Sequence, residues 1–150
     1  EGDRRRSRRW RGRAMTDFRA VTETFSVSPQ IGAEDVAAAA AQGFALIINN
    51  RPDGEAPGQP TGTEIAAAAA KAGLAYAHIP IVGRPTDEQA QAVRQAADAA
   101  GGKVLAFCRS GTRSILAWTI AEAVDGRRSD DELAGLGARA GYDVSGVLGA

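Results

Sequence analysis

The chain has 150 residues, of which 44% are hydrophobic and 24% charged, a balance that suits one compact folded domain. Its only cysteine, Cys108, excludes an intramolecular disulfide and a zinc cluster built from cysteines, and a single histidine excludes a His-rich metal site. The formal net charge is zero, and no apolar run reaches the roughly 18 residues of a transmembrane helix. We therefore expect no metal, no cofactor and no membrane partner.

The neutral total combines two opposite parts. Residues 1–14 hold seven arginines against Glu1 and Asp3, a net charge of +5, so the remaining residues carry −5. An acidic body argues against nucleic acid as a partner. The pattern changes at Met15, and we interpret residues 1–14 as an Arg-rich head that is disordered or not native, ahead of one domain at 15–150. No apolar segment follows the basic stretch, which predicts a cytoplasmic location.

In chain order, residues 18–21 and 25–27 are expected to form short strands, as a hairpin or an edge pair. Three longer strands are expected at 44–49, 74–82 and 103–107. Helices are expected at 34–42, from Thr61 to Gly73, from Pro85 to Gly101, at 114–124 and from Ser129 to Gly141. Capping-box pairs predict where several of these helices begin. Strands that alternate with helices of this length predict an α/β domain with a parallel sheet between helical layers.

The segment after the third strand carries the chemistry. Cys108 is followed by Arg109, Ser110, Gly111, Thr112, Arg113 and Ser114, where a strand turns into a helix. Backbone N–H groups at such a turn converge on one point, and the helix dipole adds positive potential there, so the turn can hold an anion and favour a thiolate. Cys108 is then a candidate nucleophile and Arg113 a planar clamp for an oxyanion, while Ser114 is expected to donate a hydrogen bond to the sulfur. A lone cysteine can also be a small buried hydrophobe.

The segments FSVSPQI, IINNRPDGE, IPIV, CRSGTRS and AGYDVSG resemble the phosphatase-like domain family of beta-lactamase hydrolase-like proteins. That family is similar in fold to the protein-tyrosine and dual-specificity phosphatases. The resemblance runs from about Met15 to near the C-terminus. It implies a three-layer α/β fold of the protein-tyrosine-phosphatase type, with Cys108 as nucleophile and Arg113 as anion clamp. It also implies a link to a metal-dependent hydrolase of sulfur metabolism.

The active loop departs from the tyrosine-phosphatase signature in two ways. Phe107 stands where the signature has histidine, and four residues instead of five separate Cys108 from Arg113. A loop of this length resembles the six-residue active loop of rhodanese-type sulfurtransferases. Three functions stay open: a cysteine-dependent phosphatase, a sulfurtransferase that carries a persulfide on Cys108, and a non-catalytic module that binds a phosphorylated ligand or senses oxidants.

The general acid that a phosphatase uses to protonate its leaving group has two candidates. Asp87 follows the second strand but also suits the first turn of a helix, and Asp53 also suits a Pro-Asp-Gly turn. Arg51 follows a buried strand and is expected either to bind a small anionic substrate or to pin its own loop through an ion pair. We interpret Trp118 and Tyr142 as core or helix-packing residues.

Overall fold

The computed structural model describes residues 16–149, so the Arg-rich head at 1–14 lies outside the described residues. A five-stranded sheet is formed by β1 (Arg19–Ala20), β2 (Phe25–Ser28), β3 (Phe44–Asn49), β4 (Ala75–His78) and β5 (Lys103–Phe107), in the order β1-β2-β5-β3-β4. All pairs are parallel except β1 with β2, which confirms the predicted edge hairpin. The predicted α/β class with a mostly parallel sheet is confirmed.

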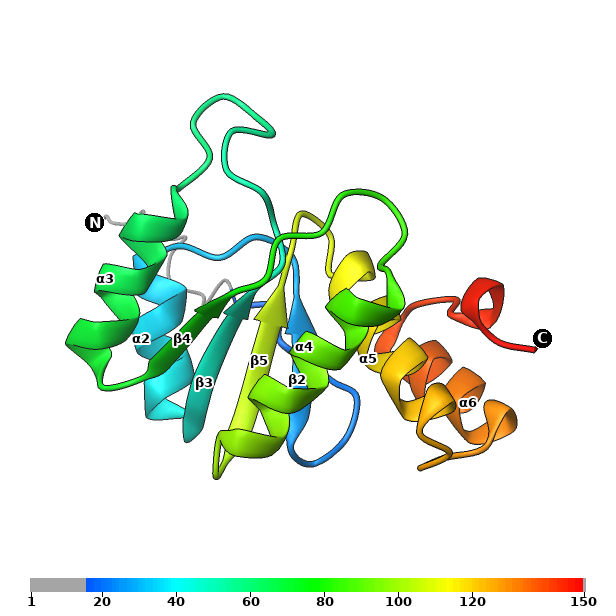
Figure 1. Ribbon diagram of the computed structural model, residues 1–150. Coiled ribbons are helices and arrows are strands. Elements are labelled where there is room, and N and C mark those ends of the chain that lie inside the picture. The colour runs from blue at the N-terminus through cyan, green and yellow to red at the C-terminus, as the bar shows by residue number, and fades with distance from the viewer. Residues whose placement is uncertain (1–15, 150) are drawn as a thin grey trace, which may run out of the picture.

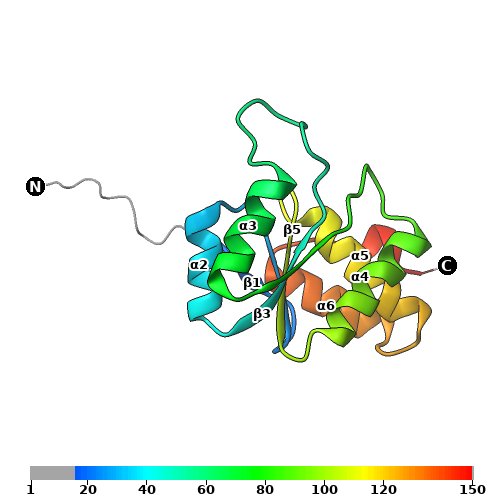
Figure 2. The ribbon, with the colours of Figure 1, turned by 60° about the vertical axis from the view of Figure 1, so that its left-hand side comes forward.

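Helices cover both faces of the sheet (Figure 1). They are α2 (Ala33–Ala41), α3 (Gly62–Ala72), α4 (Asp87–Ala99), α5 (Thr112–Val124) and α6 (Asp130–Ala140), followed by the short 3-10 helix η1 (Ser145–Val147). Helices α2 and α3 lie on one face, and α4, α5 and α6 lie on the other, as a second view also shows (Figure 2). The result is three layers.

Alternation along the strands divides the core between these two faces. In β3, Ile47 belongs to the cluster under α2 and α3, whereas Leu46 and Ile48 belong to the cluster under α4, α5 and α6. In β5, Leu105 belongs to the cluster under α2 and α3, and Ala106 belongs to the cluster under α4, α5 and α6. Successive side chains of a strand point to opposite faces, so strands buried on both sides carry the continuous apolar runs seen in the sequence.

Local capping signals set where the helices begin. Thr61 accepts a hydrogen bond from the Glu64 amide and Glu64 bonds back to the Thr61 amide, so the two close the N-terminus of α3. The same arrangement joins Thr86 with Gln89 at α4, and Ser129 with Glu132 at α6. Each pair satisfies two backbone N–H groups that a helix start leaves free.

Several predicted boundaries differ from the structure, most of them by one or two residues, and two of the differences affect the segments around Cys108. The strand expected at 74–82 ends at His78, because its partner β3 ends at Asn49 and Pro80 has no N–H to donate to a ladder. The helix expected from Ser114 begins at Thr112, with Gly111 as its N-cap, so Arg113 lies in its first turn.

The register of the sheet places four loops together. Ser28 pairs with Phe107, Phe107 with Asn49, and Asn49 with His78, so the carboxyl ends of β2, β5, β3 and β4 are level. The segments that follow these strands therefore leave the sheet at the same edge, as Figures 1 and 2 show for the loops after β3, β4 and β5. In parallel α/β sheets this edge is where ligands bind.

Candidate active site

Cys108 lies at the base of the turn between β5 and α5 and is fully buried. Its Sγ accepts a hydrogen bond of 3.1 Å from the backbone N–H of Gly111. Gly111 has a φ of +92°, a left-handed conformation that side chains disfavour, and it bends the chain so that α5 starts beside the sulfur. An anion beside the sulfur would therefore meet this N–H group and the positive end of the α5 dipole.

Arg113 is held at one edge of its guanidinium group. Nη1 and Nη2 donate hydrogen bonds of 2.8 and 2.9 Å to the two carboxylate oxygens of Glu55, and Nη1 also donates to the Ile81 carbonyl at 2.7 Å. The pKa of Arg113 is raised, mainly by the hydrogen bonds to Glu55 and also by the neighbouring Cys108. Arg113 Nε donates to no protein oxygen among residues 16–149, which leaves its Nε–Nη2 edge for an oxyanion.

Glu55 is the site residue that sequence reasoning missed. It lies in the long loop between β3 and α3, and its carboxylate bridges Arg113 and Arg51. Hydrogen bonds from Arg113, with a smaller contribution from Arg51, lower the pKa of Glu55 to about 2. Glu55 is therefore ionised at neutral pH and cannot give a proton to a leaving group. Glu55 ends the segment IINNRPDGE, but no local signal shows its role, because its partner Arg113 is 58 residues away in the chain.

Arg51 is only 5% exposed and serves the loop that carries Glu55. Its Nε donates to Glu55 at 3.0 Å and its Nη1 donates to the Gln30 side chain at 3.0 Å. Gln30 in turn donates its backbone N–H to the Arg109 carbonyl, so these contacts join the loops after β2, β3 and β5. Of the two roles expected for Arg51, the structure displays the ion pair.

Ser114 does not donate to the sulfur as expected. Its hydroxyl donates to Asn50 Oδ1 at 2.8 Å, and both residues are fully buried. The Asn50 amide is itself fixed, because its Nδ2 donates to the Ile79 carbonyl at 2.9 Å. A buried carbonyl oxygen without a donor is costly, so the hydroxyl satisfies Asn50 and ties α5 to the end of β3.

Neither candidate acid hydrogen-bonds to Cys108 or Arg113 in the described part of the chain. Asp53 accepts a hydrogen bond of 2.7 Å from the Gly62 N–H, the first residue of α3, and thus caps that helix. Asp87 is exposed at the first position of α4. The remaining loop side chains, of Arg109, Ser110 and Thr112, are exposed, and the hydroxyls of Ser110 and Thr112 are 2.9 Å apart.

Tyr142 contacts the active loop, although it was interpreted as a packing residue. Its hydroxyl donates a hydrogen bond of 2.7 Å to the Ser110 carbonyl. Burial raises its pKa. The segment after α6 brings it there, so the local sequence around residue 142 could not reveal the contact.

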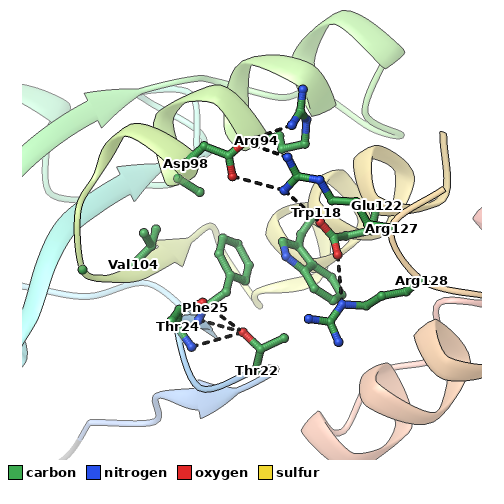
Figure 3. A pocket seen from close by; sticks show the side chains of 12 residues that line it. Thr22, Thr24, Phe25, Arg94, Asp98, Val104, Trp118, Glu122, Arg127 and Arg128 are labelled. Atoms are coloured by element: carbon green, nitrogen blue, oxygen red, sulfur yellow. Dashed lines mark hydrogen bonds and ion pairs between the residues drawn. The ribbon is translucent and has the colours of Figure 1, made fainter. Parts of the chain in front are cut away.

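A cavity of about 220 Å³ lies at the opposite edge of the sheet, beside the start of β5 (Figure 3). Phe25 stacks on Trp118 there, with ring centroids 5.7 Å apart. Its three arginines are paired with acidic residues: Arg94 and Arg127 with Asp98, and Arg128 with Glu122. Each arginine of this cavity is therefore engaged in an ion pair.

Other kinds of site find no support in the part of the chain that is described. Residues 16–149 contain no group of three or more His, Cys, Asp or Glu side chains arranged to hold a metal ion. Within the same range, no helix is long and apolar enough to cross a membrane.

A buried cysteine at the end of a central strand, a glycine turn and an arginine in the next helix define the class of proteins with the protein-tyrosine-phosphatase fold. Residues 17–125 match the family described as the beta-lactamase hydrolase-like protein, phosphatase-like domain, and the chain belongs to that family. A beta-lactamase hydrolase-like protein of Xylella fastidiosa is 38% identical over 125 residues. That match covers 83% of this chain but only 29% of the relative, so the chain corresponds to less than a third of that protein.

Solved structures agree on the fold. A candidate phosphatase from Neisseria meningitidis superposes with a TM-score of 0.78 at 30% identity, over 87% of this chain and 92% of its own. The kinase-associated phosphatase superposes with a TM-score of 0.66 at 14% identity, over 90% of this chain and 86% of its own. The predicted family resemblance and the predicted fold of the protein-tyrosine-phosphatase type are thus confirmed.

Proposed function

We propose that this domain is a cysteine-dependent phosphatase that acts on small anionic phosphate esters through a covalent adduct on Cys108. Two contacts carry the proposal together. The Gly111 N–H donates to Cys108 Sγ, and Arg113, which neighbours this sulfur, keeps an Nε–H that its hydrogen bonds to Glu55 and Ile81 do not use. The kinase-associated phosphatase has a catalytic-site cysteine and shares this fold, which supports the same role for Cys108.

In the proposed reaction, the Cys108 thiolate attacks phosphorus and forms a P–S bond as the ester P–O bond breaks. The loop amides and Arg113 bind the non-bridging oxygens, whose charge grows in the transition state. The electron pair of the broken bond leaves with the ester oxygen. Water then attacks phosphorus, releases inorganic phosphate and returns the thiolate.

The leaving oxygen sets the substrate class. Glu55 is ionised, Asp53 is engaged at the start of α3, and Asp87 hydrogen-bonds to neither Cys108 nor Arg113 among the described residues. We propose that none of these three carboxyl groups gives a proton to the departing group. We therefore expect esters whose alcohol leaves easily as an anion, such as aryl phosphates, to be hydrolysed much faster than alkyl phosphates.

The test is phosphate release from p-nitrophenyl phosphate and from a simple alkyl phosphate, with Cys108→Ser as the control. The wild type should hydrolyse the aryl ester preferentially, and Cys108→Ser should lose the activity. Release that is unchanged in Cys108→Ser would refute the proposal.

A second candidate function is sulfur transfer, which the six-residue loop from Cys108 to Arg113 favours. The thiolate would attack the outer sulfur of thiosulfate, form an S–S bond and expel sulfite, a leaving group that needs no proton. Cyanide would then take the outer sulfur as thiocyanate and restore the thiolate. Thiocyanate formation without phosphate release would favour this candidate, and failure of both assays would favour a non-catalytic module that binds phosphorylated ligands or senses oxidants.

The setting of the domain is also a proposal. We propose a cytoplasmic location and a functional link with a metal-dependent hydrolase of sulfur metabolism. For the link, the support is that the Xylella fastidiosa relative is more than three times as long as the matched part.

A further inference from the structure

Tyr142 reaches the active loop from the far end of the chain. It follows α6, and its backbone N–H donates to the Gly137 carbonyl at 2.9 Å as that helix ends. Its ring lies under the Arg19 guanidinium, 5.1 Å from centroid to Cζ. Tyr142 also lies beyond residues 17–125, the part matched by the family.

The Tyr142 hydroxyl and the Cys108 sulfur bind the two ends of one peptide group. The Ser110 carbonyl accepts from the Tyr142 hydroxyl at 2.7 Å, and the Gly111 N–H donates to Sγ at 3.1 Å. This C=O and this N–H belong to the same trans peptide plane and point in opposite directions. A hydrogen bond that holds the Ser110 carbonyl away from Cys108 therefore also points the Gly111 N–H at the sulfur.

The peptide needs such a holder because its second residue is glycine. Without a Cβ, Gly111 can adopt backbone conformations on both sides of φ = 0, so the plane between residues 110 and 111 is free to rotate. A rotated plane would turn the carbonyl oxygen toward Cys108, and its lone pairs would repel a thiolate or a bound oxyanion. A hydrogen bond to the carbonyl also polarises the amide and strengthens its N–H as a donor.

We propose that Tyr142 is a positioning residue of this site, whose hydroxyl fixes the Ser110–Gly111 peptide with its N–H on Cys108. The catalytic part of this statement rests on the proposed function, whereas the effect on thiol reactivity does not. No hydrogen bond joins Tyr142 to Cys108 in the described residues, so we assign its effect to the peptide between them.

The test is Tyr142→Phe, which removes the hydroxyl and keeps the ring under Arg19. The rate of Cys108 alkylation by iodoacetamide at neutral pH should fall roughly 2- to 10-fold, the effect of losing one hydrogen bond, and its pH profile should move to higher pH. In the phosphatase assay, kcat should fall by a similar factor. We expect the Gly111 amide proton to lie far downfield in the NMR spectrum of the wild type, because it is hydrogen-bonded to sulfur, and to move upfield in Tyr142→Phe.

Thr119→Val is the matched control. The Thr119 hydroxyl is buried and donates to a backbone carbonyl, that of Ile115, at 2.8 Å within α5. Removing it should lower the melting temperature but leave the alkylation profile and the Gly111 resonance unchanged.

The outcomes separate the two proposals. An unchanged alkylation profile and an unchanged Gly111 resonance in folded Tyr142→Phe would overturn the positioning role, whatever happens to stability. Slower alkylation in a protein that releases no phosphate, with or without the substitution, would support the positioning role and refute the phosphatase. Should Tyr142→Phe fold poorly, the wild-type spectrum decides, because a Gly111 amide proton without a downfield shift would contradict the hydrogen bond to sulfur.

Discussion

Replacing Glu55 by Gln tests the ion pair that orients Arg113. The substitution keeps the shape of the side chain and removes the charge that two arginines share. The lowering of the Glu55 pKa from its ordinary 4.5 to about 2 corresponds to about 3 kcal/mol of stabilisation if it is fully expressed. Because 27% of the side chain remains exposed to water, solvent screening reduces this, and we expect Glu55→Gln to lose about 1–2 kcal/mol at pH 7.

The loss of stability in Glu55→Gln should depend on pH in a definite direction. A carboxyl group whose pKa is lowered by folding stabilises the protein above its unfolded value, and that contribution disappears as the pH falls toward the folded value. Urea unfolding of wild type and Glu55→Gln should therefore differ most above pH 5 and converge as the pH approaches 2. Turnover should fall as well, since Arg113 loses the partner that fixes its edge. A difference in unfolding free energy that is the same at pH 7 and pH 2 would refute the electrostatic reasoning.

Three further substitutions address single contacts. Gly111→Ala should lower the unfolding free energy by roughly 1–2 kcal/mol for its left-handed backbone alone, and by more because the new Cβ would overlap the Tyr142 hydroxyl. Urea unfolding measures this loss, and an unchanged unfolding free energy would contradict the turn geometry. Ser114→Ala should cost about 1–3 kcal/mol because Asn50 loses its buried donor; a stability equal to wild type would show that this bond contributes nothing. Asp53→Ala should lower the melting temperature by the equivalent of about 1 kcal/mol because the Gly62 N–H at the start of α3 loses its acceptor while the Thr61–Glu64 capping box stays, and an unchanged melting temperature would count against this contribution.

Local signals explain what could be predicted. The capping pairs at Thr61, Thr86 and Ser129 lie within three residues of their partners, and the strand–Cys108–Gly111–helix turn is continuous in the chain. Such features depend on short-range geometry, so the sequence predicts the elements and the candidate nucleophile with its loop.

The contacts that complete the site join distant segments. Arg113 meets Glu55 across 58 residues, Ser114 meets Asn50 across 64, and Tyr142 reaches the loop across 32. These pairs depend on the strand order and on the level carboxyl ends of the strands. The hydrophobic periodicity of the sequence predicts neither of these features. Ser114 was expected to bind the sulfur because no local signal shows that Asn50 competes for its hydroxyl.

The C-terminal segment has a consequence for where this domain can be cut. Leu133 and Val144 lie in the same hydrophobic cluster as Trp118, and a side chain at Gly137 would collide with Val144. A fragment that stopped at residue 125, the limit of the family match, would expose this cluster to water and remove the Tyr142 hydroxyl that donates to the Ser110 carbonyl. Comparative work on excised domains of this kind should therefore carry the chain past α6, so that this hydrogen bond and the cluster stay intact.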